Sequence, residues 1–168
     1  MGEGQILHAR RGALAVLKFI GKIGFAQGGS RQLLASLNAF LNRMIASGEV
    51  EDFLVDLTEA TGMDSTALGL LARTTKYTLE HSDRKTVLLV TDGDMDRILE
   101  SVGFEKVFLV VHSSGECAAE LGALSQVEET DRDWATTVLA AHRELCSLNK
   151  ENADTFKGVV ECLEEALG

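Results

Sequence analysis

Short apolar runs alternate with segments of helical periodicity over the first 112 residues, and this alternation limits the chain to few folds. Four runs are apolar enough to be buried strands, namely residues 13–20, 53–57, 86–90 and 107–111. After each of the first three runs, apolar residues recur at three- and four-residue spacing, as on one face of an amphipathic helix. Strands separated by helices predict an α/β fold with a largely parallel sheet.

A β-hairpin is expected at the start of the chain. Residues 5–10 and 13–20 flank Arg11-Gly12, and glycine supplies the backbone conformation that a tight turn needs. With helices over residues 30–47, 65–81 and 94–102, the expected order is β-β-α-β-α-β-α-β. The sheet is then mixed, antiparallel at the hairpin and parallel elsewhere, and the three helices can all lie on one of its faces.

Charge divides the chain near residue 112. The whole chain of 168 residues carries a net charge of −10, but residues 113–168 hold only 4 of the 16 Lys and Arg and as many as 12 of the 26 Asp and Glu. We therefore expect one domain over residues 1–112 and an acidic helical extension over residues 113–168.

Two segments of the extension have apolar residues at helical spacing, with Asn149-Lys150 between them, which predicts an αα-hairpin. A further helical turn is expected over residues 116–124. The apolar stripe of the hairpin needs a partner, and so does the sheet face that the three helices leave open. We expect the hairpin to cover that face, or to form a homodimer contact with a second copy.

Composition argues against several classes of function. Nucleic-acid binders concentrate positive charge, which this acidic chain does not. No apolar run approaches the roughly 18 residues of a membrane span, and the first residues lack the basic and apolar regions of a signal peptide. Three cysteines without metal-ligand spacing predict a cytoplasmic protein and no metal site.

The stretch of residues 53–71 carries the strongest functional signal. We expect its strand to pass through a polar loop at residues 58–63 into a helix that begins at Asp64-Ser65. Such a loop lies at the carboxyl edge of the sheet, where α/β proteins usually keep their functional groups. Ser65 suits the N-cap of this helix, and the same position favours a phosphate because the helix dipole stabilises negative charge there.

Side chains around Ser65 indicate a contact surface rather than a catalytic one. Met63 and Leu68 are apolar and would flank an exposed loop, as in a surface that a partner covers. The Gly-x-Ser-x-Gly elbow of serine hydrolases and the phosphate-binding loop of nucleotide-binding proteins are both missing. We interpret the four histidines as surface or packing residues (His8, His81, His112 and His142). We therefore expect no catalytic residues, no enzyme activity and no cofactor.

Residues 53–71 resemble the signature of STAS domains, and specifically of anti-sigma factor antagonists. In that family an apolar strand ending in Asp-Leu leads into Asp-Ser-Ser/Thr-Gly/Ala-Leu-Gly, and this chain has Asp64-Ser-Thr-Ala-Leu-Gly69. The resemblance covers about residues 5–112. Gly24 stands where relatives often carry Asp, and Ala67 stands where glycine is commoner.

The resemblance implies a regulator in a partner-switching circuit. The unphosphorylated protein would bind an anti-sigma factor, a serine kinase of the kinase-type ATPase fold, and so free a sigma factor. Phosphorylation of Ser65 would abolish this binding and a PP2C-type phosphatase would restore it. Thr66 matches a second hydroxyl residue that is modified in some relatives. The partner-binding residues would be Met63, Asp64, Ser65, Thr66, Ala67, Leu68 and Gly24.

Two other functions stay open. A STAS-like domain can act as a scaffolding or regulatory subunit of a transport system or another signalling complex, in which the serine need not be modified. A serine hydrolase that uses Ser65 is the third reading, which a serine-directed covalent probe would test.

Overall fold

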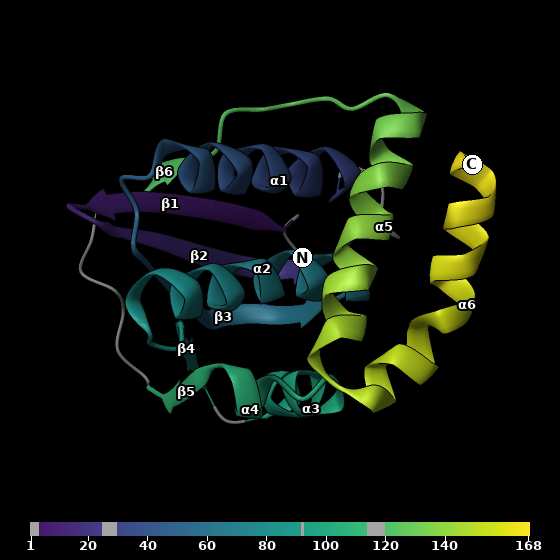
Figure 1. The fold of residues 1–168 in the computed structure, drawn as a ribbon. Coiled ribbons are helices and arrows are strands. Elements are labelled where there is room, and N and C mark those ends of the chain that lie inside the picture. Colours follow the sequence, from purple (N-terminus) through teal and green to yellow (C-terminus); the bar gives the residue numbers. More distant parts are fainter. Residues whose placement is uncertain (1–3, 25–29, 92, 114–119) are drawn as a thin grey trace.

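The computed structural model describes residues 4–24, 30–91, 93–113 and 120–168, and these form one sheet with two layers of helices on the same side (Figure 1). The strands are β1 (Gln5–Arg11), β2 (Leu14–Ile23), β3 (Asp52–Met63), β4 (Val87–Val90), β5 (Leu109–His112) and β6 (Gly122–Ala123). The helices are α1 (Ser30–Ser47), α2 (Ser65–Ser82), α3 (Asp94–Ser101), α4 (Phe104–Val107), α5 (Asp131–Leu148) and α6 (Lys150–Leu167).

The sheet has the strand order β5-β4-β3-β2-β1-β6. The predicted hairpin is confirmed, because β1 and β2 pair antiparallel and Gly12 turns the chain with a φ of 57°, a value that favours glycine. From β2 to β5 all neighbouring strands are parallel. The mixed α/β sheet expected from the sequence is therefore the one observed.

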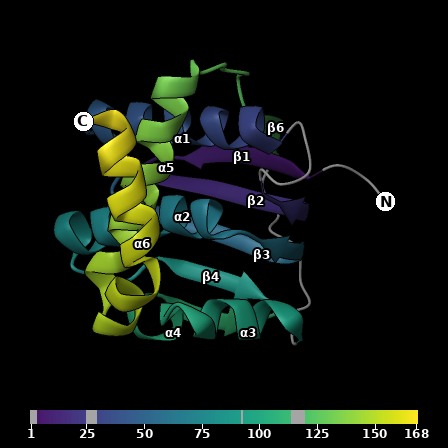
Figure 2. The ribbon, with the colours of Figure 1, turned by 90° about the vertical axis from the view of Figure 1, so that its right-hand side faces the viewer.

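Helices α1, α2 and α3 cover one face of the sheet, as predicted, and the single turn α4 lies on the same side (Figure 2). Alternate side chains of the strands point into this layer and meet the apolar stripes of the helices. The largest side chains that this packing buries almost completely are Phe19, Phe40, Phe53, Phe104, Phe108, Leu17, Ile23, Leu34, Leu37, Leu41, Leu57 and Leu70. This core fixes the position of α2 relative to β3.

Strand β3 is longer than predicted, and the expected loop at residues 58–63 is wrong. These residues continue the strand and pair with the end of β2, where Lys22 lies opposite Gly62 and Ile23 opposite Met63. The register shifts twice along this pairing, as at a β-bulge. Polar residues and a glycine resemble a loop in the sequence, but here residues 59–62 alternate between exposed and buried positions of a paired strand.

Two predictions around the sheet edges also need correction. The strand expected at residues 107–111 is preceded by the single turn α4 and begins only at Leu109. The helical turn expected over residues 116–124 is wrong in its described part, because Gly122–Ala123 form β6 and pair antiparallel with Leu7 and His8 of β1. Residues 116–119 lie outside the described residues.

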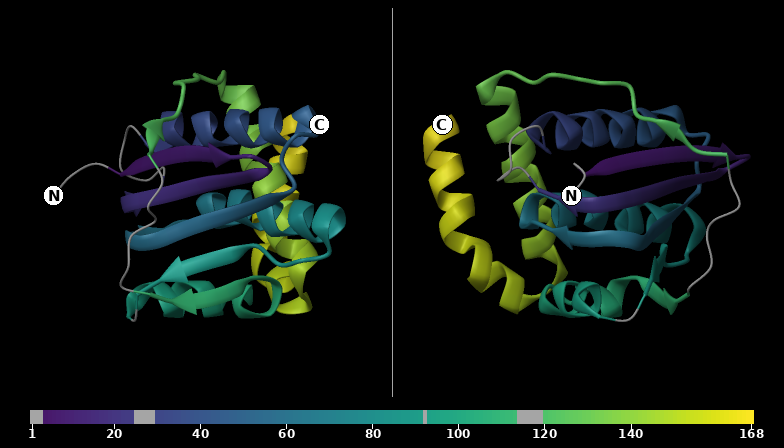
Figure 3. Two further views of the ribbon diagram at one scale, coloured as in Figure 1. Left: turned by 90° about the vertical axis from the view of Figure 1, so that its left-hand side faces the viewer. Right: turned by 180° about the vertical axis from the view of Figure 1, so that it is seen from behind.

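The predicted C-terminal hairpin is present as α5 and α6, but it does not cover the second sheet face. It lies on the outside of the helix layer, and α5 runs across α1 and α2 (Figures 1 and 2). Figure 3 shows the other sheet face with no helix of the described chain over it. Strand pairing places an apolar row on that face, made by Ala9, Val16, Leu54, Val87 and Leu109.

Each helix of the hairpin begins at a polar N-cap residue. Thr130 accepts a hydrogen bond from the backbone N–H of Asp133 at the start of α5, and Asn149 accepts one from Asn152 at the start of α6.

In the described part of the chain, no helix is both long and apolar enough to cross a membrane.

Candidate functional site

Asp64 is the single residue between β3 and α2, and it forms hydrogen bonds with residues of β2 and of α2. Its backbone N–H donates to the carbonyl of Ile23 at 3.0 Å, which continues the strand pairing. Its Oδ1 accepts from the N–H of Ala67 at 2.9 Å, so Asp64 is the N-cap of α2. The prediction that Ser65 caps this helix is therefore wrong: Asp and Ser cap equally well, and the strand pairing decides which one precedes the first turn.

Ser65 is the first residue of α2, and its hydroxyl meets a histidine from the C-terminal hairpin. Oγ lies 2.8 Å from Nε2 of His142, which is only 4% exposed. Nδ1 of His142 lies 2.7 Å from the carbonyl oxygen of Val138. Since a carbonyl oxygen can only accept, Nδ1 carries a proton, and in the neutral ring Nε2 accepts the hydrogen bond that the Ser65 hydroxyl donates.

The interpretation of His142 as a packing histidine missed this contact. The ring does pack, edge to face with Phe156 at 5.5 Å between centroids, but it also ends at Ser65. The two residues are 77 positions apart. The sequence predicts the two helices of the hairpin from their periodicity. Periodicity does not tell whether the hairpin packs on the helix layer or on the open sheet face, so the contact between the two residues could not be predicted.

Gly69 lets α5 approach α2 this closely. A Cβ on Gly69 would lie 2.1 Å from the carbonyl oxygen of Ala141, so the backbones of the two helices touch. Glycine inside a helix costs about 1 kcal/mol relative to alanine. Here the cost is offset by a helix crossing that alanine could not allow, and this crossing lies one turn from Ser65.

The other predicted partner-binding residues are less exposed than expected. Thr66 is 2% exposed, and Ala67, Leu68 and Met63 are buried as well. The expectation that Met63 and Leu68 flank an exposed loop is therefore wrong, because the strand continues to Met63 and Leu68 joins the core.

Gly24 does lie beside the site. A Cβ there would come 3.0 Å from Oδ2 of Asp64, so the backbone of residue 24 packs against the capping carboxylate. An Asp at this position would bring a second negative charge against Asp64. The absence of a side chain at Gly24 thus fits the position of the Asp64 cap in this chain.

Asp56, the acidic residue of the Asp-Leu pair, lies in β3 on the sheet face opposite α2. Its side chain is fully buried, and Oδ1 accepts from both the N–H and the hydroxyl of Thr58. Among the described residues Oδ2 has no hydrogen-bond partner, but it lies 3.9 Å from Nζ of Lys18, which also pairs with Glu59. This cluster joins β2 to β3 and is separated from Ser65 by the sheet.

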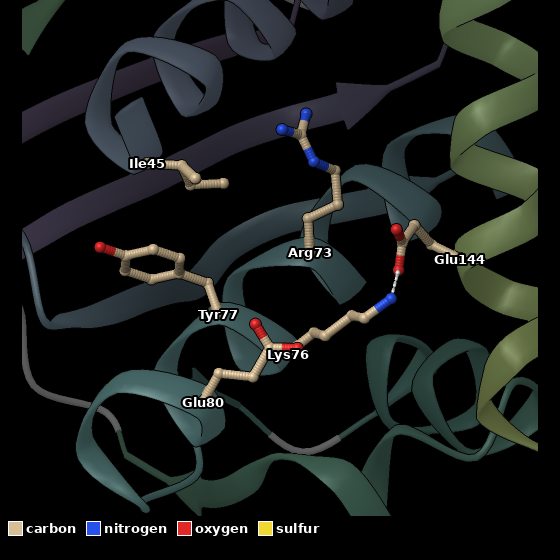
Figure 4. Close-up of a pocket in the computed structure, with 6 residues that line it drawn as sticks. All are labelled: Ile45, Arg73, Lys76, Tyr77, Glu80 and Glu144. Carbon is tan, nitrogen blue, oxygen red and sulfur yellow. Dashed lines mark hydrogen bonds and ion pairs between the residues drawn. The ribbon is translucent and has the colours of Figure 1, made fainter. Parts of the chain in front are cut away.

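A small cavity of about 150 Å³ lies between α1, α2 and α5, lined by Ile45, Arg73, Lys76, Tyr77, Glu80 and Glu144 (Figure 4). Most of its polar groups already have partners. Arg73 donates to the side-chain oxygens of Asn38 and Asn42, the Tyr77 hydroxyl donates to the carbonyl of Val50, and Lys76 pairs with Glu144 at 3.5 Å. Burial lowers the pKa of Arg73, and nearby Glu144 acts in the opposite direction. The cavity does not include Ser65.

Comparison with known proteins identifies the family and the fold. A family model, the STAS domain, matches residues 31–117, slightly more than half of the chain. Helices α5 and α6 lie beyond the matched residues. No curated protein sequence matches the chain.

Two solved structures have a similar fold. An anti-sigma factor antagonist from Mycobacterium paratuberculosis is 16% identical, with a TM-score of 0.51 over 64% of this chain and 85% of its own. The anti-sigma factor antagonist SpoIIAA in its unphosphorylated form is 17% identical, with a TM-score of 0.50 over 64% of this chain and 87% of its own. The family model and the shared fold confirm the resemblance read from residues 53–71, and the chain belongs to the STAS domain family.

Proposed function

We propose that this STAS domain protein is an anti-sigma factor antagonist whose binding is switched off by phosphorylation of Ser65. The observation that carries the proposal is the position of Ser65 as the first residue of α2, directly after the capping Asp64 at the end of β3. The two structures of similar fold bear the name anti-sigma factor antagonist, which supports the same class of function.

The physical basis of the switch is charge. A phosphate adds about −1.5 to −2 charges and three acceptor oxygens. At Ser65 it would face the N-terminal end of α2, where the helix dipole stabilises negative charge. It would also stand next to Asp64 and place a concentrated, hydrated negative charge in a partner contact. Binding can therefore be lost without any change in the fold.

The circuit needs a kinase, a phosphatase and a sigma factor. The kinase is an anti-sigma factor of the kinase-type ATPase fold, and a PP2C-type phosphatase removes the phosphate. All of them act in the cytoplasm, and neither nucleic acid nor a cofactor is a direct partner of this chain. A homodimer contact through the C-terminal helices stays a prediction.

Incubation with the cognate kinase and Mg-ATP tests the proposal. Intact-mass and peptide mass spectrometry should find one phosphate at Ser65 and none on the Ser65→Ala protein. Thr66→Ala serves as the matched control and should still carry the phosphate at Ser65. An equal level of phosphate on the Ser65→Ala protein would contradict the assignment of Ser65.

Binding to the anti-sigma factor provides the second test. Ser65→Asp should lower the affinity by about 2–5 kcal/mol if the contact desolvates the site, whereas Ser65→Ala should bind nearly as well as the parent protein. Isothermal titration calorimetry against the purified anti-sigma factor measures both.

One observation favours a second function. The Ser65 hydroxyl is already hydrogen-bonded to His142 within the chain, as it could be in a STAS subunit that is never phosphorylated. Such a protein would serve as a scaffolding or regulatory subunit of a transport or signalling complex. Genes for a kinase and a phosphatase beside the gene of this chain favour the switch, and transporter genes favour the subunit.

A further inference from the structure

The C-terminal hairpin occupies the surface around Ser65. Its helix α5 crosses α2, and three contacts lie on one side of α2: Ser65 with His142, Gly69 with Ala141, and Lys76 with Glu144 (Figure 1). Spacings of four and seven residues place these α2 positions on one helix face. The first residue of this face is the proposed phosphate acceptor.

This contact leaves Ser65 poorly placed to react. A kinase must bring its phosphoryl group in line with Oγ and provide a base for the hydroxyl proton. In the structure the hydroxyl proton is directed at Nε2 of His142, which is itself buried. Since the backbones of Gly69 and Ala141 already touch, α5 cannot rearrange around Ser65 by a small inward shift.

The hairpin is attached through one buried helix and one largely exposed helix. Helix α5 buries Trp134, Ala141 and Leu145 in the hydrophobic core, and polar contacts add to this packing. Near its start, Arg31 pairs with Asp131 at 2.9 Å on the surface, and near its middle Asn152 donates to the carbonyl of Val102 at 2.9 Å. Exposed ion pairs contribute little each and exchange readily with water. Helix α6 buries only Asn152 completely, so most of the attachment comes from α5.

We propose that the α5–α6 hairpin is a built-in cover for Ser65, which excludes kinase and anti-sigma factor while it is docked and must lift off before either can engage α2. The cover itself is inferred from the contacts of α5 with α2. That it controls phosphorylation and partner binding rests on the proposed function. The hairpin lies outside residues 31–117, the part that matches the STAS domain, so the cover is an addition to the shared fold.

A partner-independent experiment tests the cover first. Ser65→Cys places a thiol at the site, and its reaction with N-ethylmaleimide is followed by peptide mass spectrometry, so that the three native cysteines do not interfere. The thiol should react at least about tenfold more slowly than in the urea-unfolded chain, because α5 shields this partly buried position. A rate within a few-fold of the unfolded chain overturns the proposal.

Gly69→Ala should release the cover. The new Cβ would overlap the backbone of Ala141, while alanine itself favours the helix. In the Ser65→Cys background we expect labelling to accelerate by about tenfold or more, since overpacking is destabilising. Gly158→Ala on α6 is the matched control, because its Cβ meets open space, and it should leave the rate unchanged. His142→Ala should accelerate labelling too, without any overlap of backbones. If both Gly69→Ala and His142→Ala leave the rate unchanged, the cover is refuted.

Kinase and Mg-ATP then test the regulatory meaning in the chain with its native Ser65. Faster phosphorylation of the Gly69→Ala and His142→Ala proteins than of the parent supports a cover that controls access. Equal rates in all three proteins, with the thiol at residue 65 protected, overturn it. If no protein is phosphorylated, the proposed function fails, and the labelling result still decides whether the hairpin covers the site.

Discussion

Helix α2 lies between two layers that hold it by different chemistry. On the side of the sheet its residues are apolar or form buried hydrogen bonds, as with Leu71, which is fully buried, and Thr78, whose hydroxyl joins a network with Thr86. On the side of α5 the contacts are a serine–histidine hydrogen bond, one backbone crossing at Gly69 and a surface ion pair, beside the buried apolar side chains of Ala141 and Leu145 on α5.

The difference is one of degree: the α5 side depends more on contacts that water can replace than the sheet side does. Burial of a large apolar side chain contributes about 1.5–3 kcal/mol, and the cost of exposing several such side chains is met only when the whole domain unfolds. A hydrogen bond and an exposed ion pair contribute about 1 kcal/mol or less each, because water replaces them when they break. A function that needs access to Ser65 is better served by the second kind of interface.

The largest expected effect is on the sheet side of α2. Leu71→Ala should lower the free energy of unfolding by about 2–5 kcal/mol, because it leaves a cavity in the core. Leu163→Ala on α6, where the leucine is only partly buried, should cost clearly less. Urea denaturation followed by circular dichroism measures both. Equal losses would mean that the hairpin is as firmly built as the core.

The next effect concerns the hydrogen bond on the other side of α2. His142→Ala removes the acceptor of the Ser65 hydroxyl and should lower the free energy of unfolding by about 1–3 kcal/mol. Hydrogen exchange should quicken in α5 and α6 and stay slow in β3. A double-mutant cycle with Ser65→Ala isolates the pair and should give a coupling of about 1 kcal/mol. A coupling near zero would show that the contact has no energetic weight.

The fold of the domain could largely be predicted from the sequence, whereas the interface between α2 and α5 could not. The alternation of apolar runs and helical stripes predicted the mixed sheet, the helices on one face and the hairpin, because each depends on the local pattern of polar and apolar residues. The motif at Asp64-Ser65 predicted the family for the same reason, since its residues are consecutive.

Contacts between residues far apart in the sequence could not be predicted, because they depend on how whole elements pack against one another. The hairpin has an apolar stripe, but a stripe fits the open sheet face and the helix layer equally well, so the meeting of His142 with Ser65 could not be inferred. Residues 58–63 contain Thr58, Glu59 and Gly62, which are typical of loops, and become a strand only because β2 extends beside them. Strand β6 has two residues and exists through its pairing with β1.

A smaller effect should distinguish the two residues at the start of α2. Asp64→Ala removes the side chain that accepts from Ala67 and should cost about 1 kcal/mol, the usual value of an N-cap. Asp64→Asn keeps an oxygen in the same place and should lower the free energy of unfolding by only about a few tenths of a kcal/mol. Thermal or urea unfolding of both proteins gives the comparison, and a larger loss for the Asn variant would point to a role of the negative charge rather than of the cap.

The smallest effect is expected at the far end of the α2–α5 contact. Lys76 and Glu144 lie 3.5 Å apart, and the Lys76 side chain is 54% exposed, so water and salt screen the pair. Lys76→Ala should change the free energy of unfolding by less than about 0.5 kcal/mol, and raising the salt concentration should reduce even that difference. The same variant should leave the labelling rate of a thiol at residue 65 close to that of the parent, because the crossing at Gly69 and the bond to His142 stay in place. A loss of more than about 1 kcal/mol, or fast labelling, would mean that charge rather than close backbone packing holds α5 on α2.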